Sequence, residues 1–258
     1  MLSRNMAFRT KDRIPNVYEH WIAKDFFAYI RIAQGSDKRA DFLSIMNKPK
    51  RYIGRDSLCE PHVAFDEWIR MYDEQPWIAE RIEQLWYDTR VLNTLSPYAA
   101  INFIRRGIGY DDYIADYADY RNVNKEDLYD VADEILSNAK GYRTLEEWYT
   151  HIENYKKELE ELAKRGNSNE DAVVLATLHS SKGLEFEKVF LIDVNEGITP
   201  YKKAVLQPDM EEERRLFYVG MTRAKRSLTL CSVKSLHNKK VELSRFLKEA
   251  GAETLPKE

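Results

Sequence analysis

The chain has 258 residues and a formal net charge of −3, with 43% hydrophobic and 32% charged residues. These values are typical of a soluble globular protein, and no apolar run approaches the roughly 18 residues of a membrane-spanning helix. The first residues lack the apolar core of a signal peptide, so we expect a cytoplasmic protein. Cys59 and Cys231 lie far apart, which favours neither a disulfide framework nor a zinc site.

Charge is unevenly distributed along the chain. Residues 60–168 carry a net charge of −10, whereas residues 1–59 carry +6 and residues 169–258 carry +1. This contrast predicts that residues 60–168 form a domain inserted into another domain, whose two segments are residues 1–59 and 169–250, with a tail over residues 251–258. We expect any phosphate-binding surface to lie mainly outside the acidic middle.

The first segment predicts a short strand over residues 5–10 and two helices over residues 18–33 and 40–47, the first ended by Gly35. Residues 48–55 then hold four positive charges, one aromatic residue and one glycine. This basic turn has two interpretations. It is either a solvated charge run or a phosphate contact in which glycine lets backbone N–H groups approach a nucleic acid.

The middle segment has helical spacing of its apolar residues almost throughout. Pro76 and Pro97 suit the first turns of helices, Asn124 suits an N-cap, and Thr144 with Glu147 forms a capping box. We therefore expect the inserted domain to be mostly α-helical.

Two patterns in this helical segment admit a functional interpretation. A tyrosine stripe at positions 110, 113, 117 and 120 would suit base stacking, but interleaved aspartates favour a packing face. Residues 105–109, with two arginines and two glycines, resemble a helix-hairpin-helix turn that meets a phosphate. The alternative is a glycine helix cap followed by a flexible joint.

After a linker at residues 166–171 the periodicity changes. Short apolar runs predict strands buried on both faces, and helices alternate with later strands. The predicted order is strand, strand, helix, strand and helix, over residues 173–176, 189–194, 210–225, 228–233 and 243–250. The first two strands are far enough apart in the chain for a parallel pair, and the α/β pattern puts the active edge at the carboxyl ends of the strands, near Thr177, His179, Asn195 and Glu196.

One glycine in the predicted helix over residues 210–225 stands out. Gly220 costs stability inside a helix, by roughly 1 kcal/mol relative to alanine. We expect it to let another element approach closely, with Arg223 one turn later available as a phosphate ligand. The alternative is an amphipathic surface helix with ordinary ion pairs.

Two long patterns carry a specific resemblance. TLHSSKGLEF at residues 177–186 and EEERRLFYVGMTRAK at residues 211–225 resemble motifs V and VI of the UvrD/Rep/PcrA family of superfamily 1 DNA helicases. Residues 14–33 and 45–58 also resemble the segment through which that family enters its inserted helical domain. The resemblance is weakest over residues 60–164.

The resemblance implies roles for individual residues. Arg223 matches the arginine finger that reaches the γ-phosphate of ATP, and Glu185 matches the glutamate that binds the ribose. Five residues match the segment that lines the path of single-stranded DNA and couples it to the nucleotide: Thr177, His179, Ser180, Lys182 and Gly183. Gly183 is also assigned to the nucleotide site.

The basic turn matches a glycine-containing turn that holds the duplex backbone in the family. The implied contacts are Lys50, Arg51, Gly54 and Arg55. Tyr52 stands where the family often has glycine.

The sequence has no Gly-Lys dipeptide and therefore no Walker A loop, and none of its Asp-Glu pairs suits a Walker B strand end. We expect an α/β fold with a partial RecA-like parallel sheet and a mostly α-helical inserted domain. The implied function is that of a carboxyl-terminal motor-lobe part of an ATP-dependent 3′–5′ DNA helicase, inactive on its own. ATP is the implied cofactor, with Mg²⁺ held by the other lobe and no metal bound by this chain.

The implied partners are single-stranded DNA, the junction of single-stranded and duplex DNA, the first RecA-like lobe, and repair or replication proteins, with no membrane. The absence of a Walker A loop motivates an alternative, a DNA-binding or partner-recruiting module that does not use ATP. A metal-dependent nuclease is poorly supported because no ligand cluster is apparent.

Overall fold

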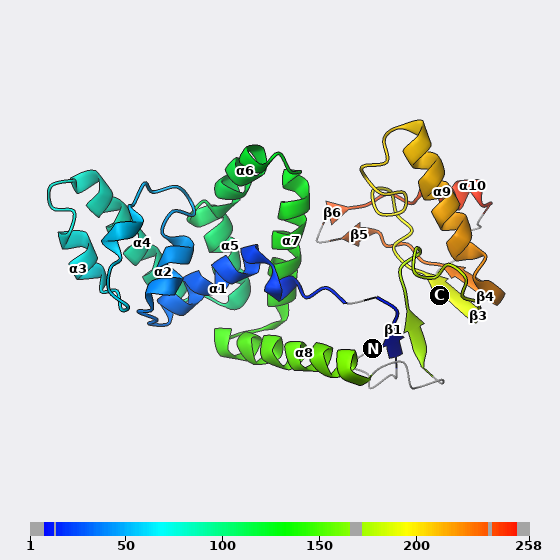
Figure 1. Ribbon diagram of the computed structural model, residues 1–258, viewed down its shortest axis with the longest axis horizontal. Coiled ribbons are helices and arrows are strands. Elements are labelled where there is room, and N and C mark those ends of the chain that lie inside the picture. Colours follow the sequence, from blue (N-terminus) through cyan, green and yellow to red (C-terminus); the bar gives the residue numbers. More distant parts are fainter. Residues whose placement is uncertain (1–7, 13, 166–171, 237–238, 252–258) are drawn as a thin grey trace. The chain divides into compact units, whose positions relative to one another are not determined.

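The protein consists of two compact units (Figure 1). The computed structural model describes residues 8–12, 14–165, 172–236 and 239–251. Pro15–Glu158 form one unit, here the helical unit, and Met1–Ile14 with Leu159–Glu258 form the other, here the strand unit. The mixture of helices with small parallel sheets agrees with the predicted α/β class, whereas the predicted boundary after residue 59 does not coincide with the division after Ile14.

The helical unit contains α-helices joined by short 3-10 or π-helical turns. In chain order these are η2 (Val17–Glu19), α1 (Trp21–Ala33), α2 (Arg39–Ile45), η3 (Arg55–Ser57), α3 (Phe65–Arg70), α4 (Pro76–Leu92), α5 (Pro97–Asn102), η4 (Phe103–Gly107), α6 (Tyr110–Arg121), α7 (Lys125–Asn138), η5 (Ala139–Gly141) and α8 (Leu145–Arg165). The part of α8 after Glu158 is assigned to the strand unit.

The predicted helix starts are confirmed in detail. Pro76 and Pro97 occupy the first turns of α4 and α5. The Asn124 side chain accepts a hydrogen bond from the Glu126 N–H at 2.9 Å. In the capping box before α8, the Glu147 N–H donates to Thr144 Oγ1 at 3.2 Å, and the Thr144 N–H donates to Glu147 Oε2 at 3.3 Å.

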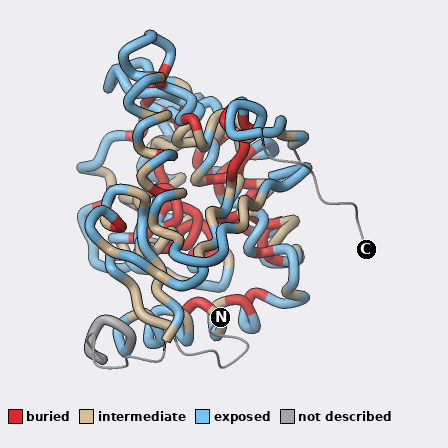
Figure 2. Tube along the Cα trace, turned by 90° about the vertical axis from the view of Figure 1, so that its right-hand side faces the viewer, coloured by how far each residue is buried: buried red, intermediate tan, exposed pale blue. Residues whose placement is uncertain are grey.

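The core of the helical unit is built around α1. Figure 2 marks the buried stretches of the chain in red. Phe26 and Tyr29 of this helix are fully buried, and Trp148 of α8 is fully buried beside Phe27, with ring centroids 5.6 Å apart. The two ends of the unit also meet, because the rings of Tyr18 and Tyr155 are 6.0 Å apart at their centroids.

The tyrosine stripe of α6 is largely a packing face, as favoured by its interleaved aspartates. Tyr110 is fully buried, and Tyr113 and Tyr117 pack beside Trp21 at centroid distances of 6.2 and 4.7 Å, whereas Tyr120 is 86% exposed.

Arg105, in the glycine-rich turn before α6, is buried. It forms ion pairs with Asp111 at 2.8 Å and Asp133 at 2.7 Å. Its guanidinium therefore stabilises the fold and is not presented to a phosphate.

The strand unit contains three two-stranded sheets among its described residues (Figure 1). Its parallel pairs are β1 (Phe8–Thr10) with β2 (Val173–Leu175) and β3 (Phe186–Leu191) with β4 (Ala224–Leu230); the antiparallel pair is β5 (Ser235–Leu236) with β6 (Lys239–Lys240); its helices are α9 (Gln207–Met221) and α10 (Arg245–Glu249).

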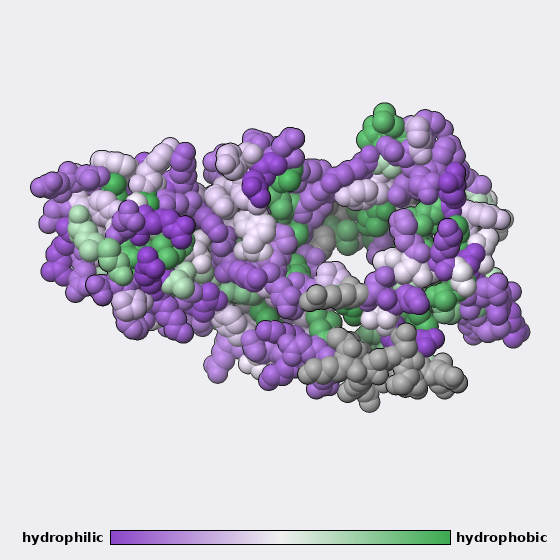
Figure 3. Space-filling view, viewed as in Figure 1, coloured by the Kyte–Doolittle hydropathy of each residue, from purple (hydrophilic) through white to green (hydrophobic). Residues whose placement is uncertain are grey.

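Two expectations about these strands were wrong, and a parallel pair of β2 with β3, which the sequence left open, is not formed among the described residues. The strand β2 pairs with β1, and β3 and β4 begin earlier than predicted. The strands are also not buried on both faces, since Phe190 is 65% and Ile192 is 68% exposed. Successive side chains of a strand point to opposite faces, and α9 packs on the face that carries Leu191. Hydrophobic residues are accordingly visible at the surface of this unit (Figure 3).

Candidate functional site

The loop after β2 folds into consecutive tight turns. The Ser181 N–H donates to the Thr177 carbonyl at 3.0 Å, and the Leu184 N–H donates to the Ser181 carbonyl at 3.0 Å. Ser181 is buried, and its hydroxyl donates to the Leu178 carbonyl at 2.7 Å. Some of the polar side chains in this loop therefore fix its backbone.

Asp12 holds this loop from β1 and was not among the predicted site residues. Its carboxylate accepts hydrogen bonds from the Thr177 N–H at 2.9 Å and from the Ser180 hydroxyl at 2.6 Å. These donors, the Ser180 hydroxyl first, hold the pKa of Asp12 below its ordinary value. Asp12 follows β1 and Thr177 follows β2, and these two strands are parallel neighbours. A prediction of this pairing from sequence would have placed Asp12 beside the loop.

The exposed residues of the loop include His179, Lys182 and Gly183. Neither the His179 side chain nor the Lys182 side chain makes a hydrogen bond or ion pair with another described residue. Gly183 has a φ of +81°, which favours glycine, and no heavy atom lies within 4 Å of the position of a Cβ. This surface is open to a ligand, whereas Thr177 and Ser180 face Asp12.

Glu185 and Arg223 lie at the same end of the β3–β4 pair. Each immediately precedes its strand, and the Phe186 N–H donates to the Arg223 carbonyl at 2.9 Å. The exposed Glu185 carboxylate is 3.4 Å from the Lys225 ammonium. This end is the amino end of both strands, whereas the residues predicted at the carboxyl edge were Thr177, His179, Asn195 and Glu196.

The carboxyl end of β3 leads to residues that stabilise the fold. Asn195 is fully buried, and its amide donates to the carbonyls of Val233 and Glu242 at 2.8 and 2.9 Å. Glu196 pairs with Arg245 at 3.1 Å. Both side chains satisfy local groups rather than forming an open site.

Arg223 lies between α9 and β4, because α9 ends at Met221 and not at the predicted residue 225. Its guanidinium donates to the Val219 carbonyl at 2.8 Å, the Leu184 carbonyl at 3.1 Å and the Thr222 hydroxyl at 2.9 Å. All three acceptors are uncharged. Its positive charge therefore has no carboxylate partner among the described residues, which suits a group that receives an anion.

Gly220 permits the close approach that the sequence predicted. A Cβ at this position would lie 2.5 Å from Leu178 Cδ2 and 3.3 Å from Leu191 Cδ2. Leu178 belongs to the loop after β2, so this loop packs directly on α9 just before Arg223.

The basic turn divides its charged residues between the interior and the surface. Arg51 is buried, and its guanidinium donates to the carbonyls of Ile45 at 3.1 Å and Met46 at 3.3 Å and to the Tyr29 hydroxyl at 3.1 Å. The predicted phosphate contact by the Arg51 guanidinium is therefore wrong, because the turn folds inward around this side chain.

The other predicted residues of the turn, Lys50, Gly54 and Arg55, are exposed. Tyr52 has a φ of +58°, in the left-handed region that favours glycine. This conformation fits the expectation that relatives have glycine here.

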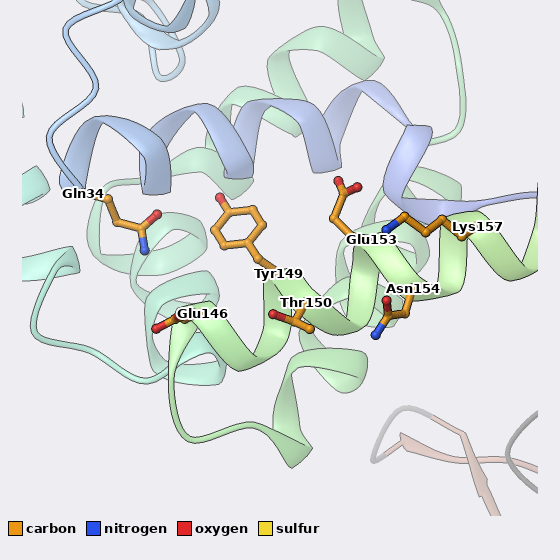
Figure 4. Close-up of a pocket in the computed structure, with 7 residues that line it drawn as sticks. All are labelled: Gln34, Glu146, Tyr149, Thr150, Glu153, Asn154 and Lys157. Atoms are coloured by element: carbon orange, nitrogen blue, oxygen red, sulfur yellow. The ribbon is translucent and has the colours of Figure 1, made fainter.

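Elsewhere in the helical unit, a groove follows the end of α1 and one side of α8 (Figure 4). Its lining carries both signs of charge, including Glu146, Glu153 and Lys157, and no predicted site residue. Within the described ranges, no three metal-ligating side chains form a group, and no helix is long and apolar enough to cross a bilayer.

Comparison with known proteins identifies the family. The model of the UvrD-like helicase C-terminal domain matches residues 78–235, which is more than half of the chain. The chain belongs to the UvrD-like helicase C-terminal domain family. The matched residues include the loop after β2, Glu185, Gly220 and Arg223. These residues lie in the two segments that resemble motifs V and VI.

Similar curated proteins are helicases. The chain is 32% identical to the ATP-dependent DNA helicase Rep of Salmonella typhimurium and 31% identical to that of Escherichia coli, each over 88% of this chain. It is 28% identical to the ATP-dependent DNA helicase PcrA of Bacillus subtilis over 84% of this chain. The chain spans 37% of the length of either Rep protein and 32% of PcrA.

Proposed function

We propose that the strand unit is part of a RecA-like motor lobe of an ATP-dependent 3′–5′ DNA helicase and that Arg223 is its arginine finger. The observation that carries the proposal is the position of Glu185 and Arg223 at one end of the β3–β4 pair, joined through the Phe186–Arg223 hydrogen bond. We also propose that this lobe is made of two segments of the chain and that the helical unit is inserted between them.

The side chains at this end fit a nucleotide. Arg223 gives up hydrogen bonds to neutral acceptors when it turns toward a phosphate, so it leaves no buried carboxylate unpaired. Its planar, permanently charged fork then matches phosphate oxygens, including the charge that develops during phosphoryl transfer. Glu185 accepts hydrogen bonds from ribose hydroxyls, and Gly183 lets the loop approach the nucleotide closely. ATP supplies the cleavable phosphoanhydride bond.

We assign the Mg²⁺ ligands and the phosphate-cradling loop to a first RecA-like lobe. The basis is the absence of a Gly-Lys dipeptide here and the greater length of the helicase relatives. On this proposal the chain alone binds ATP weakly and hydrolyses none, and its partners include that lobe and repair or replication proteins in the cytoplasm.

DNA is the proposed track. His179 and Lys182 offer hydrogen-bond donors and charge to single-stranded DNA, while Thr177 and Ser180, held by Asp12, set the shape of the loop. The contact of Leu178 with Gly220 links this loop to the helix that precedes Arg223. In the helical unit, Lys50, Gly54 and Arg55 are assigned to the duplex backbone at a junction.

The test is Arg223→Ala in a polypeptide that joins this chain to a lobe with a Walker A loop. The expected result is a fall in DNA-stimulated ATP hydrolysis of about 10³-fold or more, the usual contribution of an arginine finger. Arg226→Ala is the matched control, because Arg226 is exposed on β4 and its nearest carboxylate contact is 3.9 Å. Full ATPase activity of Arg223→Ala would refute the assignment.

A DNA-binding or partner-recruiting module that does not use ATP is the second candidate. The observation that favours it is the lack of a Walker A loop in the chain. Tight, salt-sensitive binding of forked or single-stranded DNA by this chain, together with no ATPase activity after addition of a first lobe, would support the module.

A further inference from the structure

An alternating column of cations and aromatic rings lies on the helical unit. The Lys50 ammonium is 4.6 Å from the centroid of the Tyr52 ring. The Arg81 guanidinium carbon is 5.2 Å from the Tyr52 ring and 4.9 Å from the Trp77 ring. The column joins the basic turn to the first turns of α4, and each step is within the range of a cation–π contact.

This column remains accessible to solvent. Tyr52 is 58% exposed and Trp77 is 49% exposed, although both are large aromatic side chains. The Tyr52 backbone adopts a φ that favours glycine, and the Arg81 guanidinium supports that conformation by donating to the Arg51 carbonyl at 2.9 Å. A tyrosine is thus held at the surface at a position where glycine would be less strained.

The cations that contact the rings, and Arg55 in the same turn, have no ion-pair partner in the described part of the chain. Lys50 and Arg81 lie against the rings, and neither they nor Arg55 form a salt bridge there. An exposed aromatic ring beside unpaired cations is the combination that binds single-stranded nucleic acid, because bases stack on rings while phosphates meet the charges.

Another exposed tryptophan in the same unit provides a contrast. Trp86 is 36% exposed, but its ring stacks on Phe65 at 5.6 Å with an interplanar angle of 8°, and Arg90 lies 5.1 Å from its centroid. One face of Trp86 is therefore already used by a protein ring, and the residue lies outside the basic turn.

We propose that Tyr52 and Trp77 form a stacking platform for unpaired bases of single-stranded DNA beside a junction, while Lys50 and Arg55 keep the duplex-backbone contacts proposed above. The inference rests on the proposed function only for the choice of DNA. Stacking differs from a duplex-backbone contact by the glycine-containing turn. In stacking, the aromatic rings bind bases, whereas in the backbone contact the N–H groups of the turn bind phosphates.

Tyr52→Gly separates these two modes. The substitution relieves the backbone strain and gives N–H groups freer access to a phosphate, but it removes the ring. Stacking predicts that a fluorescein-labelled 20-nucleotide single strand binds the whole chain about fivefold more weakly or worse after the change. Unchanged or tighter binding would overturn the platform.

Trp77→Ala and Trp86→Ala form the matched pair for the second ring. We expect Trp77→Ala to weaken binding of the same single strand about fivefold or more, and Trp86→Ala to leave it unchanged. Equal losses in the two variants, or no loss in Trp77→Ala, would contradict the inference. Far-ultraviolet circular dichroism of each variant checks that the helical unit remains folded.

An abasic strand of equal length and charge tests the platform without any mutation. It retains the phosphates but offers no bases, so the unaltered chain should bind it more weakly than the normal strand at the same salt concentration. Equal affinity for the two strands would refute stacking. This result is independent of Arg223, whose failure in the ATPase assay would instead refute the motor assignment.

Discussion

The two units of the protein are stabilised in different ways. The helical unit has an extensive core around α1, whereas the buried hydrophobic cluster of the strand unit consists, among described residues, of Val194, Phe217 and Phe246. The residues proposed for the nucleotide belong to the unit with the small core. Their positions depend on hydrogen bonds and tight turns, such as those between Asp12 and the loop after β2, more than on packing.

Phe26→Ala should have the largest effect on stability. Phe26 is fully buried in α1, and removing a phenylalanine from such a core costs about 3–5 kcal/mol. Urea unfolding followed by circular dichroism at 222 nm should show the helical transition at a much lower urea concentration.

Phe246→Ala is the counterpart in the strand unit. It should raise the labelling rate of the half-buried Cys231 by a thiol reagent while leaving the helical transition nearly unchanged. A large shift of the helical transition in Phe246→Ala would contradict the proposed difference between the units.

Gly220→Ala should have an intermediate effect. The new Cβ would meet Leu178 Cδ2 at 2.5 Å, so the loop side chain must move, at a cost of about 1–3 kcal/mol. Thermal unfolding monitored by Cys231 labelling measures this loss. Gly141→Ala is the control, since no heavy atom lies within 4 Å of its Cβ position. Equal stability of the two variants would mean that the Leu178 contact is dispensable.

Asp12→Asn should have the smallest and most local effect. The substitution weakens the hydrogen bonds that hold Thr177 and Ser180, so exchange of the Thr177 amide hydrogen should accelerate on the order of tenfold. Glu187→Gln, an exposed change on β3, should leave this amide unaffected. Similar exchange rates in the two variants would show that Asp12 does not hold the loop.

The same carboxylate predicts a dependence on pH. In the folded protein, the pKa of Asp12 lies below its ordinary value of 3.8. The stabilisation that the Asp12 carboxylate provides is therefore complete above the pKa of the unfolded chain. The effect is lost as the pH falls below 3.8 through the lowered pKa. The difference in Thr177 exchange between the unaltered protein and Asp12→Asn, corrected for intrinsic rates, should therefore be constant near neutrality and shrink only in acid.

Local features of the fold were predictable from sequence, and long-range ones were not. Pro76, Asn124 and the Thr144–Glu147 box act within a few residues, so their helix starts were predicted correctly. The pairing of β1 with β2 joins segments separated by the whole helical unit, and no local pattern specifies it.

The candidate site shows the same limit. The need for close packing at Gly220 was evident from its cost in a helix, but its partner Leu178 was not. Arg51 resembled its basic neighbours in sequence, because composition does not reveal which cation of a turn folds inward to satisfy backbone carbonyls.

The contact between Tyr18 and Tyr155 has a consequence for the order of folding. In an unfolded chain, bringing β1 to β2 requires closure of a loop that contains the whole helical unit, which is entropically costly. Once the helical unit has folded, its two ends are already close, and most of that entropy has been lost. The motif-bearing strands are therefore expected to assemble late in biosynthesis, after α8 has emerged from the ribosome and docked.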